Sequence, residues 1–431
     1  MSPKKNFTGN GPGSLDTSFG VEGKLLLEIP GFQEVEIGGL CIDETNNKIY
    51  AACTVRAASA QLSYALIRLN PDGSFDTDFA GTGFVTDQFR EGVDCRGISI
   101  TLLGSGTLLL SGVIEQTSCL ACYKSTGELE KEFGTGGKVV LDVLGDSHSS
   151  SNPNEAPTSD VGAGAFCKAC LLPDGKILVT SHHSFGIRQV GLLIRLNSNG
   201  SLDTSFKGTG YLIVSHPSYS DTATLLSSVT EHPDGSYLGF GGVWDYGERR
   251  TLLLRCDANG NMDPSMGPDG FCLISSEAPS SPSLLESELV EQSNGRMLII
   301  ANIATPPSGI LTSLTANGIP DLPFNEGKQV ITQLESAGLN WSAGAIQADR
   351  KILVTGYRRS ATLNYNLVVA RFLETGQLDL TFNDKGWVTN GEPNRADEGS
   401  AVALQKDGKI IVAGYASSVI QKFGLILRYL G

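Results

Sequence analysis

Short apolar runs bounded by Gly, Asp and Asn recur along the whole chain, as in Gly83–Thr86 and Lys409–Gly414. Runs of about four to eight Val, Ile and Leu residues between such turn formers are typical of β-strands. No helical period of comparable length accompanies them. The pattern therefore predicts an all-β chain with many turns.

A second regularity is an internal repeat, first seen as GSLDTSFGVEG and then as GSFDTDFAGTG, GSLDTSFKGTG and GQLDLTFNDKG. Each copy carries an aromatic or Met anchor, and successive anchors lie 54 to 73 residues apart. Two other elements, close to PDGKILVTG and LLIRLNPDG, recur with the same period. A fixed period of this length indicates a repeat architecture. The seven anchors are Phe19, Phe79, Phe133, Phe206, Met266, Phe324 and Phe382.

Each repeat divides into four short strands separated by an Asp-Gly turn and a Gly-x-Leu-Asp turn. Four-stranded units repeated around an axis form a β-propeller, and seven units fall within its usual range. We expect residues 1–12 to be a tail and residues 13–431 to form a single seven-bladed β-propeller domain. Residues Ser400–Leu430 supply only three strands, so the N-terminal strand, about Val21–Ile29, is predicted to complete the last blade. Such closure removes exposed strand edges.

The repeat G-x-L-D-x-S-F-G-x-x-G, followed by D-G-K-I-x-V-x-G, resembles the delta-60 repeat family of bacterial β-propellers. The resemblance covers about Gly13 to Gly431, with departures such as Glu130 for the Asp, Met266 for the Phe and Arg350 for the turn Gly. It implies the propeller fold and transfers no catalytic residue.

The chain is acidic, since 46 Asp and Glu residues against 32 Lys and Arg residues give a net charge of −14. This charge argues against nucleic acid and anionic membranes as partners. We find no run of 18 apolar residues and no apolar signal segment, which predicts a cytoplasmic protein, with export without a leader left open. Phosphate-binding and dinucleotide-binding glycine motifs are absent, so we expect no cofactor. We also expect a monomer.

Residues that recur in every repeat are expected to serve the fold. Acids of the Leu-Asp turn, such as Asp203 and Asp379, are expected to bind turn backbone amides; a metal ring is the alternative. An Arg that recurs in five repeats is expected to pack or form ion pairs between blades. These arginines are Arg68, Arg195, Arg255, Arg371 and Arg428.

Nine cysteines include two C-x-x-C pairs, Cys119 with Cys122 and Cys167 with Cys170. Both pairs are predicted within strands, where residues three apart point to opposite faces. Neither pair is then expected to chelate one ion, and an odd cysteine count argues against a disulfide framework. We expect no zinc and no disulfide.

Strand order divides the loops between two rims of the ring. The Asp-Gly and Leu-Asp turns lie on what we call the uniform rim. The loops between second and third strands, together with the connections between repeats, lie on the opposite variable rim, where binding loops are expected. Residues 142–161 form the longest of these loops.

Candidate ligand contacts on the variable rim are aromatic and basic residues, the types enriched at binding hot spots. Incidental exposure is the alternative. The candidates are Trp244, Tyr246, Arg249, Trp341, Arg358 and Arg359.

Four histidines map to variable-rim loops of the third and fourth units and, with nearby acids, are candidate metal ligands or acid–base catalysts. Solvated histidines are the other interpretation, and no H-x-x-x-H spacing supports a site. They are His148, His182, His183 and His216.

Two hypotheses follow. The first is a rigid binding module that recognises a protein, a peptide or a glycan through the Trp, Tyr and Arg residues. The second is a lyase or hydrolase that uses the histidines. We favour binding, because no catalytic motif is present.

Overall fold

The computed structural model describes residues 11–104, 106–115, 117–145, 167–185, 188–245, 248–278, 283–292, 295–335, 338–359, 365–392, 394–418 and 421–431. Within these ranges the chain is built of β-strands, with only short 3-10 turns between them. These turns include Pro217–Tyr219, Pro264–Met266, Pro268–Gly270 and Asn325–Gly327. The prediction of an all-β chain is confirmed.

Consecutive strands pair in antiparallel groups of four. In the first half of the chain the groups are β2 (Phe32–Asp43), β3 (Lys48–Ala57), β4 (Leu62–Leu69) and β5 (Phe84–Asp87); β6 (Cys95–Leu102), β7 (Leu108–Ile114), β8 (Thr117–Tyr123) and β9 (Lys138–Val140); β10 (Ala169–Leu171), β11 (Ile177–Phe185), β12 (Arg188–Leu196) and β13 (Tyr211–Val214).

The second half continues in the same way. Its groups are β14 (Ala223–Glu231), β15 (Tyr237–Asp245), β16 (Glu248–Cys256) and β17 (Phe271–Ile274); β18 (Leu285–Glu291), β19 (Met297–Ala304), β20 (Pro307–Leu314) and β21 (Val330–Thr332); β22 (Leu339–Ile346), β23 (Ile352–Arg359), β24 (Tyr365–Phe372) and β25 (Trp387–Asn390); and β26 (Ala396–Leu404), β27 (Ile410–Ser417) and β28 (Lys422–Tyr429), whose fourth strand is β1 (Lys24–Leu27).

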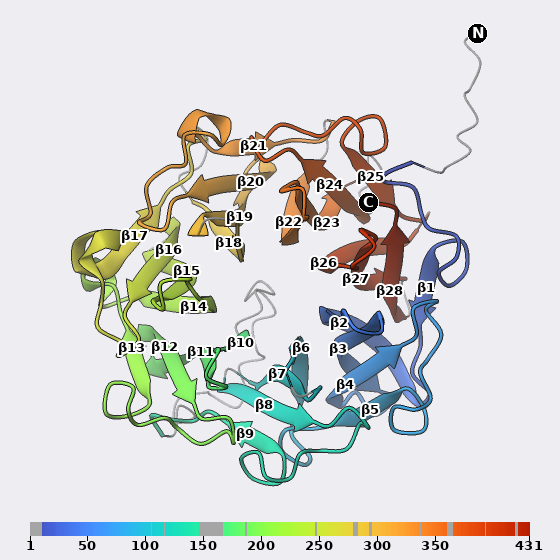
Figure 1. Ribbon diagram of the computed structural model, residues 1–431, viewed down its shortest axis with the longest axis horizontal. Coiled ribbons are helices and arrows are strands. Elements are labelled where there is room, and N and C mark those ends of the chain that lie inside the picture. Colours follow the sequence, from blue (N-terminus) through green and yellow to red (C-terminus); the bar gives the residue numbers. More distant parts are fainter. Residues whose placement is uncertain are drawn as a thin grey trace.

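The strand β1 joins the two ends of the chain, as the sequence predicts. It runs antiparallel to β28, from Lys24 opposite Leu427 to Leu27 opposite Gly424. Two further sheet contacts between neighbouring groups are single parallel pairs, one of which joins Glu34 of β2 to Lys422 of β28. Figure 1 shows the groups side by side around a ring, with the first and last parts of the chain adjacent.

The hydrophobic core lies between the faces of neighbouring groups. Leu66 of β4, for example, belongs to one buried cluster with Leu108 of β7, and Ile49 of β3 to another with Ile411 of β27. Burying a Leu, Ile or Phe side chain contributes about 1.5–3 kcal/mol. The repeat anchors are all buried, and each belongs to a cluster of this kind, as Phe19 and Phe206 do.

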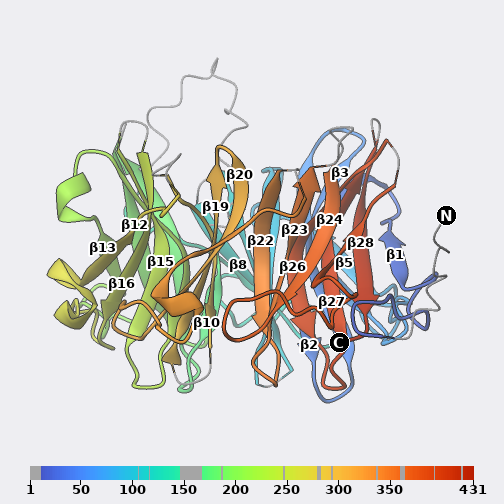
Figure 2. The same ribbon diagram turned by 90° about the horizontal axis from the view of Figure 1, so that it is seen from above.

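The innermost strands, β2, β6, β10, β14, β18, β22 and β26, lie nearest the axis of the ring (Figure 1). Small residues let them approach closely: a Cβ on Gly39 of β2 would lie 2.8 Å from the Cα atom of Ser99 on β6. Figure 2 shows the strands running from one rim to the other, so that the two ends of a strand place their residues at opposite rims. No helix of the described part is long and apolar enough to cross a membrane.

Candidate functional site

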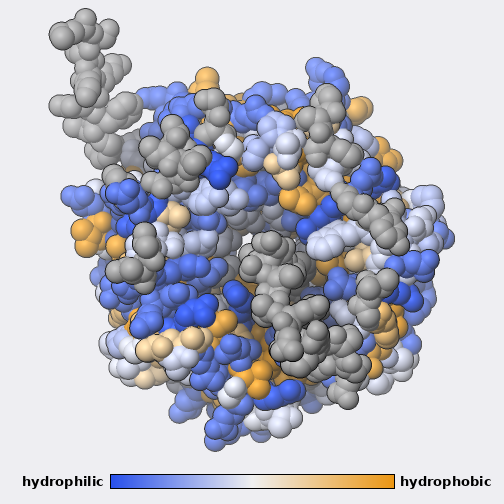
Figure 3. All heavy atoms as spheres, turned by 180° about the vertical axis from the view of Figure 1, so that it is seen from behind, coloured by the Kyte–Doolittle hydropathy of each residue, from blue (hydrophilic) through white to orange (hydrophobic). Residues whose placement is uncertain are grey.

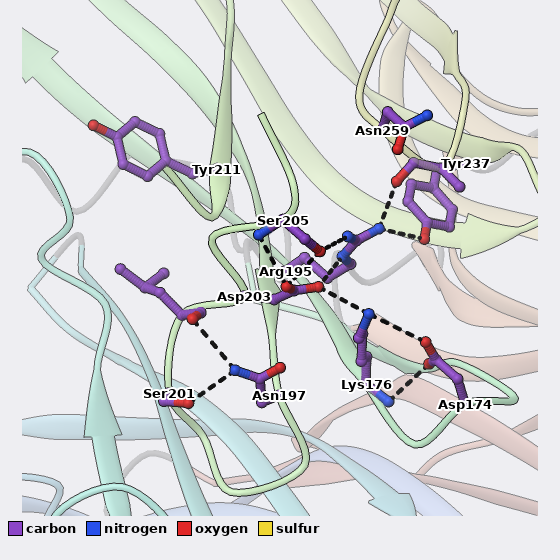
Figure 4. A network of polar contacts seen from close by, with 12 residues as sticks. Asp174, Lys176, Arg195, Asn197, Ser201, Asp203, Ser205, Tyr211, Tyr237 and Asn259 are labelled. Carbon is purple, nitrogen blue, oxygen red and sulfur yellow. Dashed lines mark hydrogen bonds and ion pairs between the residues drawn. The ribbon is translucent and has the colours of Figure 1, made fainter. Parts of the chain in front are cut away.

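The uniform rim is held by one ion-pair arrangement, which is drawn for Arg195 and Asp203 in Figure 4. The Arg195 Nε atom lies 2.7 Å from a carboxylate oxygen of Asp203, and both residues are buried. Arg195 also donates to the Tyr237 hydroxyl, at 3.1 Å, and its guanidinium lies 4.8 Å from the ring centre of Phe206. This network connects the third repeat to strand β15 of the next group.

The same pairing recurs along the chain, and the Arg atom Nε lies 2.6 to 3.0 Å from the acid in each further pair. These pairs are Arg68 with Asp76, Arg255 with Asp263, Arg371 with Asp379 and Arg428 with Asp16. The recurring arginines do form ion pairs, but each pair lies within one group. Their contact with the neighbouring group is a hydrogen bond to a backbone carbonyl, as from Arg68 to Ser125 and from Arg255 to Ala316.

The acid of each pair also accepts from the turn backbone, as predicted. The backbone N–H of Ser205 donates to Asp203 at 3.1 Å, and the backbone N–H of Thr381 donates to Asp379 at the same distance. Burial by itself would raise the pKa of Asp203. Hydrogen bonds from Ser205 and Lys176 and the charge of Arg195 instead hold that pKa well below its usual range.

The variable rim is the face seen in Figure 3, where hydrophilic and hydrophobic residues surround a central hollow. Two of the predicted ligand contacts on this side are held in ion pairs. Arg249 donates from two nitrogens to the buried carboxylate of Glu286 and lies 4.4 Å from the ring centre of the half-buried Trp244. Arg358 donates to the Leu334 carbonyl, at 3.1 Å, and pairs with a carboxylate oxygen of Glu335. Both guanidinium groups are thus already engaged by carboxylates of the protein itself.

Trp341 is a correction to the predicted set. It lies on strand β22, where Leu339, Trp341 and Ala343 alternate toward the interior, and it has no exposed surface. A strand residue with this alternation belongs to the core, so Trp341 is not a surface contact. Arg359 is exposed and lies over Tyr365, 5.8 Å from the ring centre. Tyr246 lies outside the described residues.

The structure does not bring the predicted histidines together. His182 and His183 are consecutive on strand β11, so their side chains point to opposite faces of the sheet. His183 packs on Phe185, with ring centres 4.5 Å apart, whereas the ring nitrogen Nδ1 of His216 accepts from the Ser218 backbone. Burial lowers the pKa of His182 to about 4. His148 lies outside the described residues.

The nine cysteines are free thiols. Cys119 and Cys122 lie within strand β8, as predicted, but Cys167 precedes strand β10, so the prediction of a strand at both Cys167 and Cys170 is wrong. Among the described residues no group of three or more His, Cys, Asp or Glu side chains could hold a metal ion.

A set of half-buried polar residues that the sequence reasoning missed lies near the variable-rim ends of strands β2, β23, β26, β27 and β28. We call it the rim cluster, and its members are Glu36, Tyr357, Glu398, Tyr415 and Lys422. The ammonium of Lys422 lies 3.1 Å from the Glu36 carboxylate and 4.4 Å from the ring centre of Tyr415. Glu398 is directly opposite Tyr415 in the sheet and is hydrogen-bonded to it.

The electrostatics of the rim cluster favour the protonated form of Glu398. Burial raises the pKa of Glu398, and the neighbouring charge of Glu36 raises it further, while Tyr415 and Lys422 oppose the rise. Burial also raises the pKa of Tyr357. The Tyr357 ring meets that of Tyr365, with centres 4.8 Å apart, which extends the cluster toward Arg359. The arrangement combines aromatic faces with hydrogen-bond donors and acceptors.

A sequence signal for the rim cluster existed in the innermost strands. The innermost strand Leu339–Ile346 carries no charged residue, whereas Ala396–Leu404 carries Asp397 and Glu398 in succession and Phe32–Asp43 carries Glu36 near its variable-rim end. Asp397 is paired with Arg395 at 2.6 Å and is fully buried. Comparing the innermost strands for such charges would have singled out Glu36 and Glu398 together with acids outside the cluster, such as Glu288 of β18.

Four-stranded groups arranged around an axis define the chain as a β-propeller. A family model described as "Domain of unknown function (DUF5122) beta-propeller" matches residues 44–79, 172–206, 347–382 and 405–428. These segments coincide with the repeats found in the sequence. No curated protein sequence matches the chain.

Among solved structures, the chain is similar to a polysaccharide lyase, with a TM-score of 0.48, 9% identity, and coverage of 99% of this chain and 94% of the other. It is also similar to a Trypanosoma rangeli sialidase in complex with the inhibitor DANA, with a TM-score of 0.42, 10% identity, and coverage of 93% and 55%. A third similar structure is prolyl oligopeptidase B from Galerina marginata, with a TM-score of 0.48, 10% identity, and coverage of 91% and 51%.

Proposed function

We propose that the four-stranded groups are the blades of a closed seven-bladed propeller of the delta-60 type, which spans residues 13–431 as one domain and acts as a monomer. Two contacts support the closure. The strand β1 pairs with β28, and Arg428 lies 2.9 Å from the Asp16 carboxylate. A closed ring leaves only short, protected strand edges, so its loops have a rigid support.

On this ring, the propeller is a binding module that uses its variable rim to recognise a protein, a peptide or a glycan. The observation that carries this proposal is the rim cluster, whose members come from β2, β23, β26, β27 and β28 and are all half-buried. The arginines of the uniform rim are engaged in structural ion pairs. The proposed ligand contacts are Tyr357 of the rim cluster and the adjacent Tyr365 and Arg359.

The chemistry of the rim cluster favours a glycan. Tyrosine offers an apolar face together with a polar hydroxyl, which suits a sugar ring that carries both C–H groups and hydroxyls. Glu36 already has Lys422 as its partner, so a charged ligand group is not required to neutralise it. The carboxylate oxygens are acceptors for ligand hydroxyls.

A glycan array and a peptide array, probed with the purified full chain, test the proposal. We expect a glycan to bind, and we expect Tyr357→Ala to weaken that binding at least tenfold, as for a hot-spot aromatic residue. Tyr211→Ala is the matched control, because Tyr211 is also half-buried but lies on the outermost strand β13. Binding of peptides alone would contradict the choice of glycan. Binding unaffected by Tyr357→Ala would contradict the proposed site.

A second candidate function is acid catalysis at the same cluster, favoured by the raised pKa of Glu398 beside a second carboxylate. A carboxyl group whose environment raises its pKa can act as a general acid. A general acid must be protonated, so hydrolysis of a bound glycan would slow as pH rises through the pKa of Glu398. Release of reducing ends that is lost in Glu398→Gln would support catalysis, whereas glycan binding without release would leave binding as the function.

A further inference from the structure

A cavity of about 410 Å³ opens on the channel side of four innermost strands. Its walls come from strands β6, β10, β14 and β18 and from Lys168, the residue before β10. Thr101 and Leu171 lie at or next to the ends of their strands, close to the Asp-Gly turns. The cavity is therefore in the half of the channel nearer the uniform rim, away from the rim cluster. Its volume is within the usual range for small-molecule sites.

One ion pair contributes both charges to the cavity wall. Lys168 pairs with one carboxylate oxygen of Glu288. Lys168 precedes β10 and Glu288 lies on β18, and the group that begins with β14 stands between their two groups. The other oxygen of Glu288 accepts from the Gly344 backbone at 2.7 Å. Glu288 is therefore anchored by β22, while the more exposed Lys168 side chain has room to turn toward a ligand.

A buried hydroxyl in the same wall has no hydrogen-bond partner within the described structure. Ser228 lines the cavity, is 7% exposed, and its Oγ atom is unpaired. It follows a β-bulge in which the register shifts between Leu226 and Ser228. Bulges re-aim side chains and are frequent beside functional sites. Leaving a buried hydroxyl unpaired is costly, so such a group calls for a partner.

We propose that this cavity binds a small dipolar ion, in the form of a free aliphatic α-amino acid. The ligand ammonium takes the place of Lys168 on Glu288, and the ligand carboxylate binds Lys168 and the Ser228 hydroxyl. Leu171, Val229 and Leu289 of the wall receive the aliphatic side chain.

The ion pair explains why the ligand must carry both charges. A dipolar ion exchanges one ion pair for two, so both protein charges keep a partner. A ligand with a single charge would leave Lys168 or Glu288 unpaired in a partly buried site, which is unfavourable. This site is independent of the rim cluster and of the function proposed for it.

Isothermal titration calorimetry of the full chain with three matched probes tests the proposal. The probes are L-leucine, 4-methylpentanoic acid, which lacks the ammonium, and isoamylamine, which lacks the carboxylate. We expect L-leucine to bind at least thirtyfold more tightly than either single-charge probe. Equal binding of all three probes would overturn the assignment. So would the absence of L-leucine binding at a ligand concentration of about 10 mM, which would detect even a millimolar dissociation constant.

Variants locate the binding in the cavity. Ser228→Ala changes no charge and is expected to weaken L-leucine binding about tenfold, and Glu288→Gln more than that. The control is Glu34→Gln, which removes a carboxylate from an ion pair with Arg56, at 2.8 Å, outside the cavity and the rim cluster. Should Glu288→Gln fail to fold, Ser228→Ala remains decisive. Unchanged affinity in Ser228→Ala, or an equal loss in Glu34→Gln, would contradict the site.

Discussion

At the uniform rim, the contact between Arg195 and Asp203 is repeated with the same geometry by Arg371 and Asp379 in another group. At the variable rim, Arg249 meets its acid on a neighbouring innermost strand, as Lys422 does with Glu36, while Arg358 meets its acid in the preceding connection. Ion pairs are thus found on both rims, but those of the uniform rim recur in five groups with one geometry, whereas the described pairs of the variable rim differ in residue type and in partner. An ion pair that recurs with one geometry marks a need that the groups share, and one that varies marks where a group was free to change.

The largest effect is expected from removing the strand that holds the ring together, since both rims depend on it. Deletion of residues 1–29 removes β1 and the partner of Arg428, Asp16. An unpaired strand edge and apolar surface on β28 would then be exposed, which promotes aggregation. We expect aggregation or a large loss of melting temperature, measured by light scattering and differential scanning fluorimetry. A monomeric deletion variant with an unchanged melting temperature would contradict the closed ring.

The next-largest effect compares the loss of stability when an ion-pair arginine is replaced on each rim. Arg371→Met leaves Asp379, which is 3% exposed, without its closest cation, although Lys351 stays 3.6 Å away. Removing one partner of a buried ion pair is strongly destabilising, so we expect the free energy of unfolding in urea to fall by about 2–4 kcal/mol. Arg358→Met on the variable rim should cost less, because Glu335 is largely exposed and can be solvated. Equal losses would remove the distinction between the rims.

A smaller, pH-dependent effect is expected from His182, near the variable-rim end of β11. Burial lowers its pKa in the folded protein to about 4, below the value of about 6.5 in an unfolded chain. The unfolded chain therefore binds the proton more readily, and stability falls as pH decreases from about 6.5 to 4. We expect His182→Gln to remove on the order of 1–3 kcal/mol of this pH-dependent change. Urea titrations with the same slope against pH in both proteins would refute the assignment.

The smallest effect on stability is expected for Arg359, which is exposed and contacts Tyr365 only at 5.8 Å from its ring centre. Arg359→Ala should change the free energy of unfolding by less than about 0.5 kcal/mol. The same change should weaken glycan binding if Arg359 contacts the ligand together with Tyr357 and Tyr365. Loss of stability without loss of binding would assign Arg359 to the fold instead.

Much of the fold could be predicted from the sequence because the repeats encode it locally. The Asp-Gly turns, the anchors such as Phe206 and the recurring arginines such as Arg195 each act within one blade and its neighbour. Repetition shows that such residues are structural even without coordinates. The pairing of β1 with β28 was also predictable, because the last repeat lacks its fourth strand.

The candidate site was predicted less well, because it depends on contacts between distant segments. Trp341 was assigned to the surface, yet its place in the alternation of β22 directs it into the core. The pairing of Lys422 with Glu36 joins opposite ends of the chain and leaves no local pattern. Residue type alone could not show which arginines were already paired.

The position of β1 also sets the order of events during protein synthesis. The strand Lys24–Leu27 is made about 400 residues before its partner in β28, Gly424–Leu427. At about 5–20 residues per second, the first strand waits roughly 20 to 80 seconds for that partner. Throughout this interval the nascent chain carries an apolar segment whose backbone N–H and C=O groups lack the strand with which they pair in the folded protein. A factor that shields it on the ribosome should therefore raise the yield of folded protein.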